Sequence, residues 1–176
     1  DTPSRIFWAS GACLCIRRFC YHEAGGLDGD FFAHMEEIDL CWRLASRGWE
    51  LACVPQSVVY HVGGGSLPKE NPHKDYLNFR NNLLMLYKNL PKERLWKVMM
   101  VRWFLDYMAA MVFLLKGKWG SFSAVWRARR DYQRMKTTMD FMRKRRENME
   151  NMRVKEPYGI FKRCIVWDYH VKHFHS

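Results

Sequence analysis

Neither a secretory signal nor an internal repeat is visible in this sequence of 176 residues. The first residues, Asp1-Thr2-Pro3-Ser4, do not form the basic start of a signal peptide, so nothing indicates export. We therefore expect the six cysteines to be reduced thiols. General disorder is excluded, because 48% of the residues are hydrophobic and 27% are charged. The chain starts without Met and soon becomes apolar, and we expect it to be part of a longer protein.

Acidic residues are scarce in the second half of the chain. Residues 91–176 carry twenty Lys or Arg against eight Asp or Glu, whereas residues 1–90 carry nine against ten. The net charge of +11 therefore comes from the second half. This asymmetry predicts a neutral domain followed by a basic extension, and it is this extension that should meet an acidic partner.

The first half has the pattern of an α/β domain. Residues 5–18 are mostly apolar or small at both alternating sets of positions, which predicts a strand covered on both faces. After a glycine-rich loop, a helix is predicted to start near Glu36. Its apolar face is predicted to contain Ile38, Cys41, Trp42 and Ala45. Residues 49–54 and 57–61 are predicted as two short strands, and the glycine run 63–65 ends this part of the chain.

The second half is predicted to be helical, with a first helix from about Lys74. Its buried side is predicted to contain Leu77, Leu84 and Tyr87. Residues 98–115 contain only two charged residues, and at about 1.5 Å per residue such a helix is just long enough to cross a bilayer. The two charges, Arg102 and Asp106, are four residues apart and should pair on one face, which argues against a simple lipid-exposed span. The side chains left for lipid or a protein partner are Trp103, Phe104, Met111 and Phe113.

Three carboxylates follow the glycine-rich loop, and they belong to Glu36, Glu37 and Asp39. They can simply stabilise the start of a helix, because its dipole favours negative charge there by about 0.3–1 kcal/mol. They can also act in catalysis if one of the pair Glu36 and Glu37 points into a cleft as a general base. Such a base takes a proton from an attacking hydroxyl and typically contributes about 10²–10⁴-fold. The residues alone leave both alternatives open.

Several motifs occur together in the order and spacing of a known family. They are Ser10-Gly11-Ala12, Ile16-Arg17-Arg18, Ala24-Gly25-Gly26-Leu27-Asp28 with Phe31-Phe32, residues 36–43, Gly48-Trp49, Pro55, residues 59–66 and Arg80-Asn81-Asn82. Together they resemble the second half of the catalytic domain of family 2 glycosyltransferases, in particular the bacterial rhamnosyltransferase-like members that build surface polysaccharides. The resemblance covers about residues 5–90. It implies the C-terminal half of an α/β domain of the GT-A type over residues 1–66, a connecting loop and helix over 67–92 and a basic helical extension over 93–176.

The resemblance also implies roles for the acidic residues. The family's usual pair is Glu-Asp with the second residue as base, so Glu37 is the matching base here, although Glu reaches one methylene further than Asp. Glu36 stays a second candidate for the base. Asp39 matches the following acid of the family and is read as structural or as orienting the acceptor. Because the reaction is a single displacement assisted by one base, the resemblance implies inversion at the anomeric carbon.

A divalent metal and a donor site are implied in the same way. His61 matches the histidine that completes the coordination of Mn²⁺ or Mg²⁺ on the donor diphosphate, and a neutral imidazole suits such an ion. The predicted substrate-binding residues are Gly11, Gly25, Gly26 and Arg43. The family's Asp-x-Asp motif after a buried strand is not found, and we treat Asp28-Gly29-Asp30 as a coincidence because it directly precedes the acidic helix. We therefore expect a C-terminal part of the enzyme that is inactive without the nucleotide-binding half.

Three other interpretations of parts of the sequence are possible. Cys13, Cys15, Cys20 and His22 could bind zinc, but their spacing is not that of common structural zinc sites. The basic half could bind nucleic acid, but a long apolar segment beside basic residues favours an anionic membrane surface instead. A third alternative is a helical hairpin that packs on the catalytic domain or on a second subunit.

The sequence thus predicts transfer of a sugar from a nucleotide-sugar donor to a saccharide or lipid-linked saccharide acceptor. The predicted location is the cytoplasm, at the inner face of the cell membrane, and nucleic acid is not an expected partner. The alternative function is a non-catalytic basic module that binds a membrane or a protein partner.

Overall fold

The computed structural model describes residues 2–62, 71–153 and 158–160. The predicted glycine end at 63–65, the start of the predicted connector at 67–70, Cys164 and residues 161–176 of the predicted extension lie outside the described residues. The elements are β1 (Ser4–Ile6), α1 (Arg18–Glu23), a short 3₁₀ turn (Gly29–Phe31), α2 (Glu36–Ser46), β2 (Leu51–Cys53), α3 (Pro72–Asn89), α4 (Lys92–Leu115) and α5 (Trp119–Arg153).

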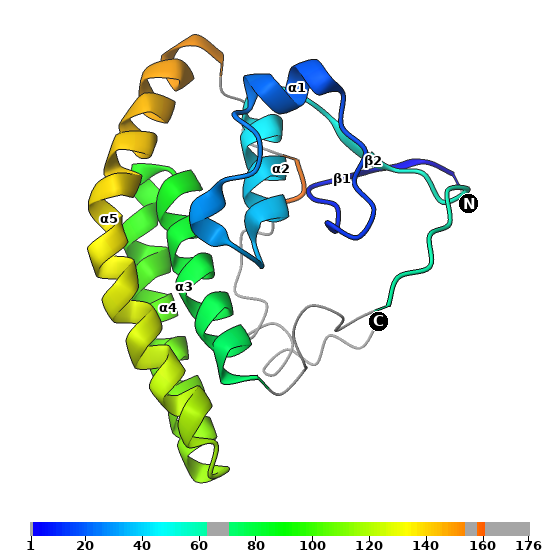
Figure 1. Ribbon diagram of the computed structural model, residues 1–176. Helices are drawn as coiled ribbons and strands as arrows, with labels where there is room; N and C mark the ends of the chain where they lie inside the picture. Colours follow the sequence, from blue (N-terminus) through cyan, green and yellow to red (C-terminus); the bar gives the residue numbers. More distant parts are fainter. Residues whose placement is uncertain (1, 63–70, 154–157, 161–176) are drawn as a thin grey trace, which may run out of the picture.

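Three long helices form one side of the molecule (Figure 1). Helix α3 begins at Pro72, where the side chain of Asn71 caps the first turn by accepting from the His73 N–H at 2.9 Å. Only Leu90 and Pro91 separate α3 from α4, and a three-residue turn separates α4 from α5, so successive helices are antiparallel (Figure 1). Helices α3 and α5 consequently run in the same direction, side by side.

Close packing joins α3 to α5 along their length. At their shared start, a Cβ on Gly120 would lie 2.7 Å from Cγ of Pro72, so only glycine allows this approach. Further along, the Tyr76 hydroxyl donates to Oδ2 of Asp131 at 2.9 Å. The buried side chains include the predicted Leu77, Leu84 and Tyr87 of α3 and also Val125, Ala128 and Tyr132 of α5. The predicted buried side of α3 is thus confirmed.

The predicted helix at the acidic motif is confirmed as α2. Of its predicted apolar face, Cys41 and Trp42 are buried, while Ile38 and Ala45 are half-buried. Leu40 and Leu44 are buried as well, because α2 is covered on more than one side. In Figure 1 it lies between α3 and the small sheet.

Of the predicted strands, that at 49–54 is confirmed as β2 (Leu51–Cys53), and those at 5–18 and 57–61 were largely wrong. Of residues 5–18, only the first two belong to a strand, β1, which pairs antiparallel with β2 so that Ser4 lies opposite Cys53. The apolar run at 12–16 does not extend the strand because the described part supplies a sheet of only two strands, and Cys13 and Cys15 are exposed. Residues 57–61 form no strand, and Val58 and Val59 are exposed.

The fold class is therefore only partly as predicted. The described residues form a mostly helical structure with one small antiparallel sheet, and they contain no parallel sheet of the kind expected for an α/β domain. The GT-A architecture stays a prediction. Helix α3, which falls in the predicted connector 67–92, packs against α5 of the predicted extension.

The predicted helix at 98–115 is confirmed, but it begins six residues earlier, at Lys92. The predicted pairing of Arg102 with Asp106 is also confirmed, with 2.6 Å between Nη2 and Oδ1. Asp106 has a second partner from α5, because Nη1 of Arg129 lies 2.8 Å from its Oδ2. Among the described helices, α4 alone is long and apolar enough to cross a membrane by length and composition.

Candidate functional site

The acidic pair Glu36 and Glu37 forms the first turn of α2, at the end of an unusual loop. Three residues before the pair have positive φ angles although none is glycine: Phe32 at 63°, His34 at 68° and Met35 at 75°. Met35 is the N-cap of α2, and its carbonyl accepts from the Asp39 N–H at 2.8 Å. Such backbone is costly and persists only where its surroundings hold it, which makes the loop a candidate for function.

The strained part of the loop is centred on Phe32. Its φ and ψ of 63° and −60°, with the Ala33 N–H donating to the Phe31 carbonyl at 2.7 Å, form the rare γ-turn of positive φ. Phe31 is fully buried, whereas the side chain of Phe32 is 78% exposed. The turn thus follows a buried ring, that of Phe31, and leaves the ring of its own central residue, Phe32, exposed.

Helix α3 holds this loop through two side chains. Nδ2 of Asn81 donates to the carbonyl oxygens of Phe31, Ala33 and His34 at 2.8, 2.7 and 2.8 Å. Nη2 of the neighbouring Arg80 donates to the carbonyl of Phe31 at 3.1 Å. Because Asn81 is fully buried, these bonds compete little with water and fix the backbone that leads into α2.

A second segment, residues 7–11, runs along α2. The ring of Phe7 meets that of Trp42 edge to face at 5.4 Å, and the thiol of Cys41 bonds the backbone at Ala9. At the end of the segment, a Cβ on Gly11 would lie 3.8 Å from Cβ of Glu37. The structure therefore places two predicted site residues, Gly11 and Glu37, near each other. A Cβ at position 11 would be in ordinary van der Waals contact with the Glu37 side chain.

Buried polar atoms without a partner gather at this place. Among the described residues, six buried side-chain polar atoms have no hydrogen-bond partner, and three of them belong to this segment: Oε2 of Glu36, Oε2 of Glu37 and Nε2 of His34. Burial raises the pKa of Glu36, and the charge of Glu37 adds to this, whereas its own backbone N–H and the charge of His34 oppose it. A carboxylate with a raised pKa and a free oxygen is suited to take a proton from a bound hydroxyl.

Other predicted site residues form a separate, buried network. Gly25 and Gly26 have φ angles of 83° and 68°, which side chains rarely adopt, and Tyr21 lies 3.1 Å from where a Cβ on Gly26 would be. Arg43 holds this loop, because its guanidinium donates to the carbonyls of Ala24 and Gly26, the latter at 2.7 Å. The observed contacts of Arg43 thus lie within the protein, and its role in substrate binding stays a prediction.

Asp39 is the centre of this network. It is fully buried and accepts from Nε of Arg43 at 2.8 Å, Nζ of Lys88 at 2.9 Å and Nδ2 of Asn89 at 2.6 Å. Lys88 also bonds Oδ2 of Asp28 at 2.6 Å. Burial by itself would raise the pKa of Asp28, but the hydrogen bond and charge of Lys88 bring it below its ordinary value. Asp39 thereby ties α2 to the end of α3 and to the glycine loop.

Lys88 and Asn89 were not predicted from the sequence as site residues. A signal for Lys88 was present, because Leu77, Asn81, Leu84 and Lys88 follow the i, i+4, i+7, i+11 spacing of one helical face. A polar residue on an apolar helical face is buried only with partners, so Asn81 and Lys88 indicated buried acceptors elsewhere in the chain.

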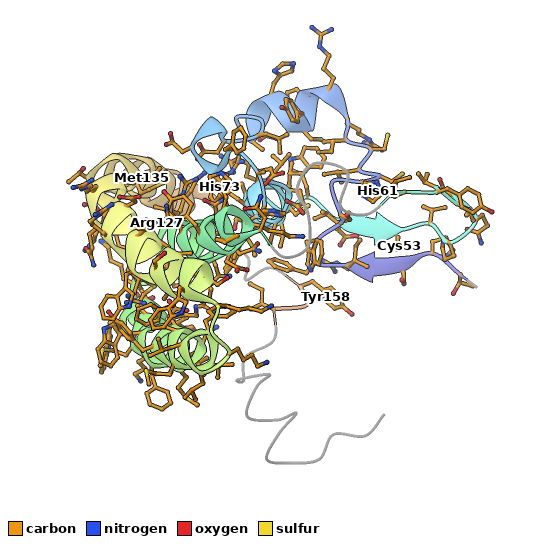
Figure 2. The ribbon with its side chains drawn as sticks, turned by 60° about the horizontal axis from the view of Figure 1, so that its bottom comes forward. Cys53, His61, His73, Arg127, Met135 and Tyr158 are labelled. Carbon is orange, nitrogen blue, oxygen red and sulfur yellow. The ribbon has the colours of Figure 1, made fainter. Side chains whose placement is uncertain are left out.

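His61 lies apart from these groups in sequence and is exposed. Figure 2 shows it on the side of the molecule that carries Cys53 of β2, whereas His73, Arg127 and Met135 lie on the side of the long helices. Among the described residues, no group of three or more His, Cys, Asp or Glu side chains could hold a metal ion. These residues therefore do not form a complete metal site, and His61 as a metal ligand stays a prediction.

A hollow of about 450 Å³ lies between α1, α2 and the small sheet. Its lining includes Ile6, Leu14, Ile16, Leu44, Trp49 and Leu51. The acidic pair is not part of this lining, so the hollow and the candidate base are separate features.

Comparison with known proteins gives two kinds of relative. The chain is 43% identical over 56 residues, 32% of its length, to the N-acetylglucosaminyl-diphospho-decaprenol L-rhamnosyltransferase of two Mycobacterium tuberculosis strains. It is 27% identical over 77 residues, 43% of its length, to a low-salt glycan biosynthesis hexosyltransferase of Haloferax volcanii. No family model and no solved structure matches.

This chain contains a glycosyltransferase-like segment. The resemblance predicted from the motifs is thus confirmed by relatives that transfer rhamnose or another hexose. The matched segments span only 18% and 25% of the length of these relatives. The names of the relatives support glycosyl transfer in general.

Proposed function

We propose that this chain supplies the catalytic base of an inverting glycosyltransferase. The observation that carries the proposal is the pair Glu36 and Glu37, each with a buried carboxylate oxygen that has no partner, at the start of α2 in a chain with glycosyltransferase relatives. Glu37 is the proposed base, since it takes the position that the family resemblance implies. It also lies beside Gly11, where a Cβ would be 3.8 Å from Cβ of Glu37.

The proposed reaction is a single displacement. The acceptor hydroxyl oxygen forms a bond with the anomeric carbon of the donor sugar, while the bond from that carbon to the nucleotide diphosphate breaks. Glu37 receives the hydroxyl proton, and the diphosphate leaves with the bonding electrons. Attack from the face opposite the leaving group inverts the anomeric configuration. The strained loop held by Asn81 would keep the base in position for this attack.

Donor and acceptor classes follow from the relatives. We propose a rhamnosyl or hexosyl nucleotide as donor and a saccharide, free or linked to a lipid diphosphate, as acceptor, because one relative is named for such a lipid-linked substrate. Synthesis of cell-surface polysaccharide at the cytoplasmic face of the membrane fits this acceptor. Mn²⁺ or Mg²⁺ stays the proposed cofactor, with His61 as one ligand, and such an ion would neutralise the leaving diphosphate. Since the described residues form no complete metal site, no step here depends on it.

The test is an assay of sugar transfer by the full-length protein with a panel of nucleotide-sugars and a lipid-linked saccharide. Glu37→Gln keeps the shape of the side chain but cannot accept the proton, so we expect transfer to fall by about 10²–10⁴-fold while nucleotide binding is retained. Glu36→Gln should cost less. Glu50→Gln is the control, because Glu50 is exposed and lies beyond the end of α2 in the sequence, so this variant should transfer like the unchanged protein. Unchanged turnover in Glu37→Gln would exclude Glu37 as the base, and a larger loss in Glu36→Gln would assign the role to Glu36.

The second candidate function is a non-catalytic basic module that binds a membrane or a protein. It is favoured by the apolar surface that α4 leaves exposed. Absence of transfer from every donor tested, in a protein that is folded and binds its partner, would favour this candidate over catalysis.

A further inference from the structure

Helix α4 exposes a broad apolar face that the rest of the described structure does not cover. In the most apolar stretch of 18 residues in α4, only 11% is buried. The exposed side chains on this face are Met100, Val101, Trp103, Phe104, Met108, Met111, Val112 and Leu115. We name these residues the α4 face. No charged residue interrupts it from Met100 to Leu115, because Arg102 and Asp106 point to the opposite side, and a patch of this kind on a protein marks an interaction surface.

The opposite side of α4 is joined to α5 by charged groups. Asp106 is buried and lies 2.6 Å from Arg102 and 2.8 Å from Arg129 of α5. Helix α5 runs beside α4 (Figure 1), and its Arg127 and Arg130, which are close to Arg129 in the sequence, are exposed. If α4 crossed a bilayer in this arrangement, these arginines would enter the hydrocarbon with it, which is costly. The arrangement therefore favours a helix that lies along a surface.

The α4 face continues onto α5 through aromatic rings. The ring of Tyr107 lies 4.8 Å from that of Trp103 and 4.8 Å from that of Trp126 of α5, which is itself half exposed. Arg130 and Arg134 follow Trp126 at i+4 and i+8, so they lie on the same face of α5. Both are well exposed, although Oδ1 of Asp131 lies 3.5 Å from Nε of Arg130 and 3.6 Å from Nη1 of Arg134, so one carboxylate partly offsets the two charges. Lys97 is exposed near the start of α4. We name Lys97, Arg130 and Arg134 the basic margin of the α4 face.

We propose that the α4 face lies in the interfacial layer of an anionic bilayer, with the axis of α4 parallel to the membrane plane. Trp103, Phe104 and Trp126 would enter the boundary between headgroups and acyl chains, where aromatic rings are favoured. Lys97, Arg130 and Arg134 would contact the anionic headgroups. Charge complementarity favours this occupant over a second copy, because two such faces brought together would also bring their basic margins together.

The proposal is tested by flotation of the protein with vesicles of phosphatidylcholine, alone or mixed with phosphatidylglycerol. We expect roughly tenfold tighter binding to the mixed vesicles, and loss of this preference in about 0.5 M salt. The double variant Trp103→Gln/Phe104→Gln should lower binding to the mixed vesicles roughly tenfold. Phe19→Gln is the matched control, because Phe19 is an exposed aromatic residue on α1, outside the α4 face, and its change should leave binding unaltered. Circular dichroism verifies that each variant is folded.

A second pair of variants separates the charge from the apolar contact. Arg130→Gln/Arg134→Gln should reduce the preference for anionic vesicles while the remaining binding resists salt. Equal binding to both kinds of vesicle, or unaltered binding by Trp103→Gln/Phe104→Gln, would overturn the proposal. So would a dimer in sedimentation that dissociates in Trp103→Gln/Phe104→Gln while no vesicle binding occurs, since a second copy would then cover the face. None of these readouts depends on glycosyl transfer, so the proposed function can fail without this inference failing.

Discussion

Nζ of Lys88, near the end of α3, lies 2.9 Å from Oδ2 of Asp39 in the first half of α2. The same nitrogen lies 2.6 Å from Oδ2 of Asp28 in the glycine loop, so one cation bridges two carboxylates. All three side chains are nearly inaccessible to water. The long-helix side of the molecule is thereby fixed to the segment that carries the candidate base.

Removal of this cation should be strongly destabilising. In Lys88→Met the side chain keeps much of its volume, but two buried carboxylates lose their shared partner, and we expect a loss of about 3–5 kcal/mol in the free energy of unfolding. Urea unfolding followed by circular dichroism measures this loss. Lys116→Met, at an exposed lysine after α4, is the control and should change stability by less than about 0.5 kcal/mol. Equal stability of the two variants would mean that the buried ion pairs contribute nothing.

Asn81 should be a second determinant of stability. In Asn81→Ala the carbonyls of Ala33 and His34 lose the amide that they bond, and an unsatisfied buried carbonyl costs about 1–3 kcal/mol. We expect a total loss of about 2–3 kcal/mol in urea unfolding. The control removes the exposed amide of Gln133 on α5, where Gln133→Ala should have almost no effect. A small loss in Asn81→Ala would show that the loop backbone finds other donors.

The γ-turn at Phe32 predicts a stabilising substitution. Backbone in this region costs about 1–3 kcal/mol for a residue with a side chain but not for glycine, and the exposed Phe32 ring contributes little packing. After the entropy that glycine gains in the unfolded state is subtracted, Phe32→Gly should raise the free energy of unfolding by about 1 kcal/mol. The same change at Phe19, inside helix α1, should instead lower it by about 0.5–1 kcal/mol. A loss of stability in Phe32→Gly would indicate that the ring is anchored after all.

The helices were predictable because their signals are local. The apolar spacing of α2 and α3 fixes which sides are buried, and the four-residue spacing of Arg102 and Asp106 was sufficient to predict their ion pair. The second partner of Asp106, Arg129, is distant in sequence, and no local pattern indicated it. The same limit applies to the loop of the candidate site, because Asn81 holds carbonyls almost fifty residues away in the chain.

The strand predictions at 5–18 and 57–61 failed for a different physical reason. An apolar run such as residues 12–16 forms a buried strand only if neighbouring strands accept its hydrogen bonds and cover its faces. The described residues provide one partner, β2, and it is three residues long. The sequence could indicate a preference for β structure but could not show that the partners are absent from the described part of the chain.

The candidate site itself was predicted as residue types but not as an arrangement. The motif indicated that Glu36 and Glu37 start a helix, and the structure adds the nearness of Glu37 to Gly11 and the strained backbone before the pair. Arg43 and Asp39 were expected near substrate, and their observed partners are groups of the protein itself. The physical reason is that several of these partners, Lys88 for Asp39 and the carbonyls of Ala24 and Gly26 for Arg43, are distant in the sequence.

Burial of Glu36 predicts a stability that depends on pH in a definite direction. Because the pKa of Glu36 is raised above its ordinary value of 4.5, the folded state resists its ionisation more than the unfolded state does. Below about pH 4.5 the carboxyl is protonated in both states, and ionisation costs the fold nothing. As the pH rises from there through the raised folded pKa, a destabilisation develops and then stays constant. Glu36→Gln cannot ionise and should avoid it.

We therefore expect Glu36→Gln to be more stable than the unchanged protein at about pH 7 and to approach it in stability at about pH 4. Urea midpoints measured across this range test the prediction, since the gap between the two proteins must open with rising pH. A gap that is the same at every pH would mean that the amide acts through packing or hydrogen bonding instead. If the gap opens as expected, the fold tolerates a destabilising carboxylate next to the proposed base Glu37, and destabilising ionisable groups of this kind are common at functional sites.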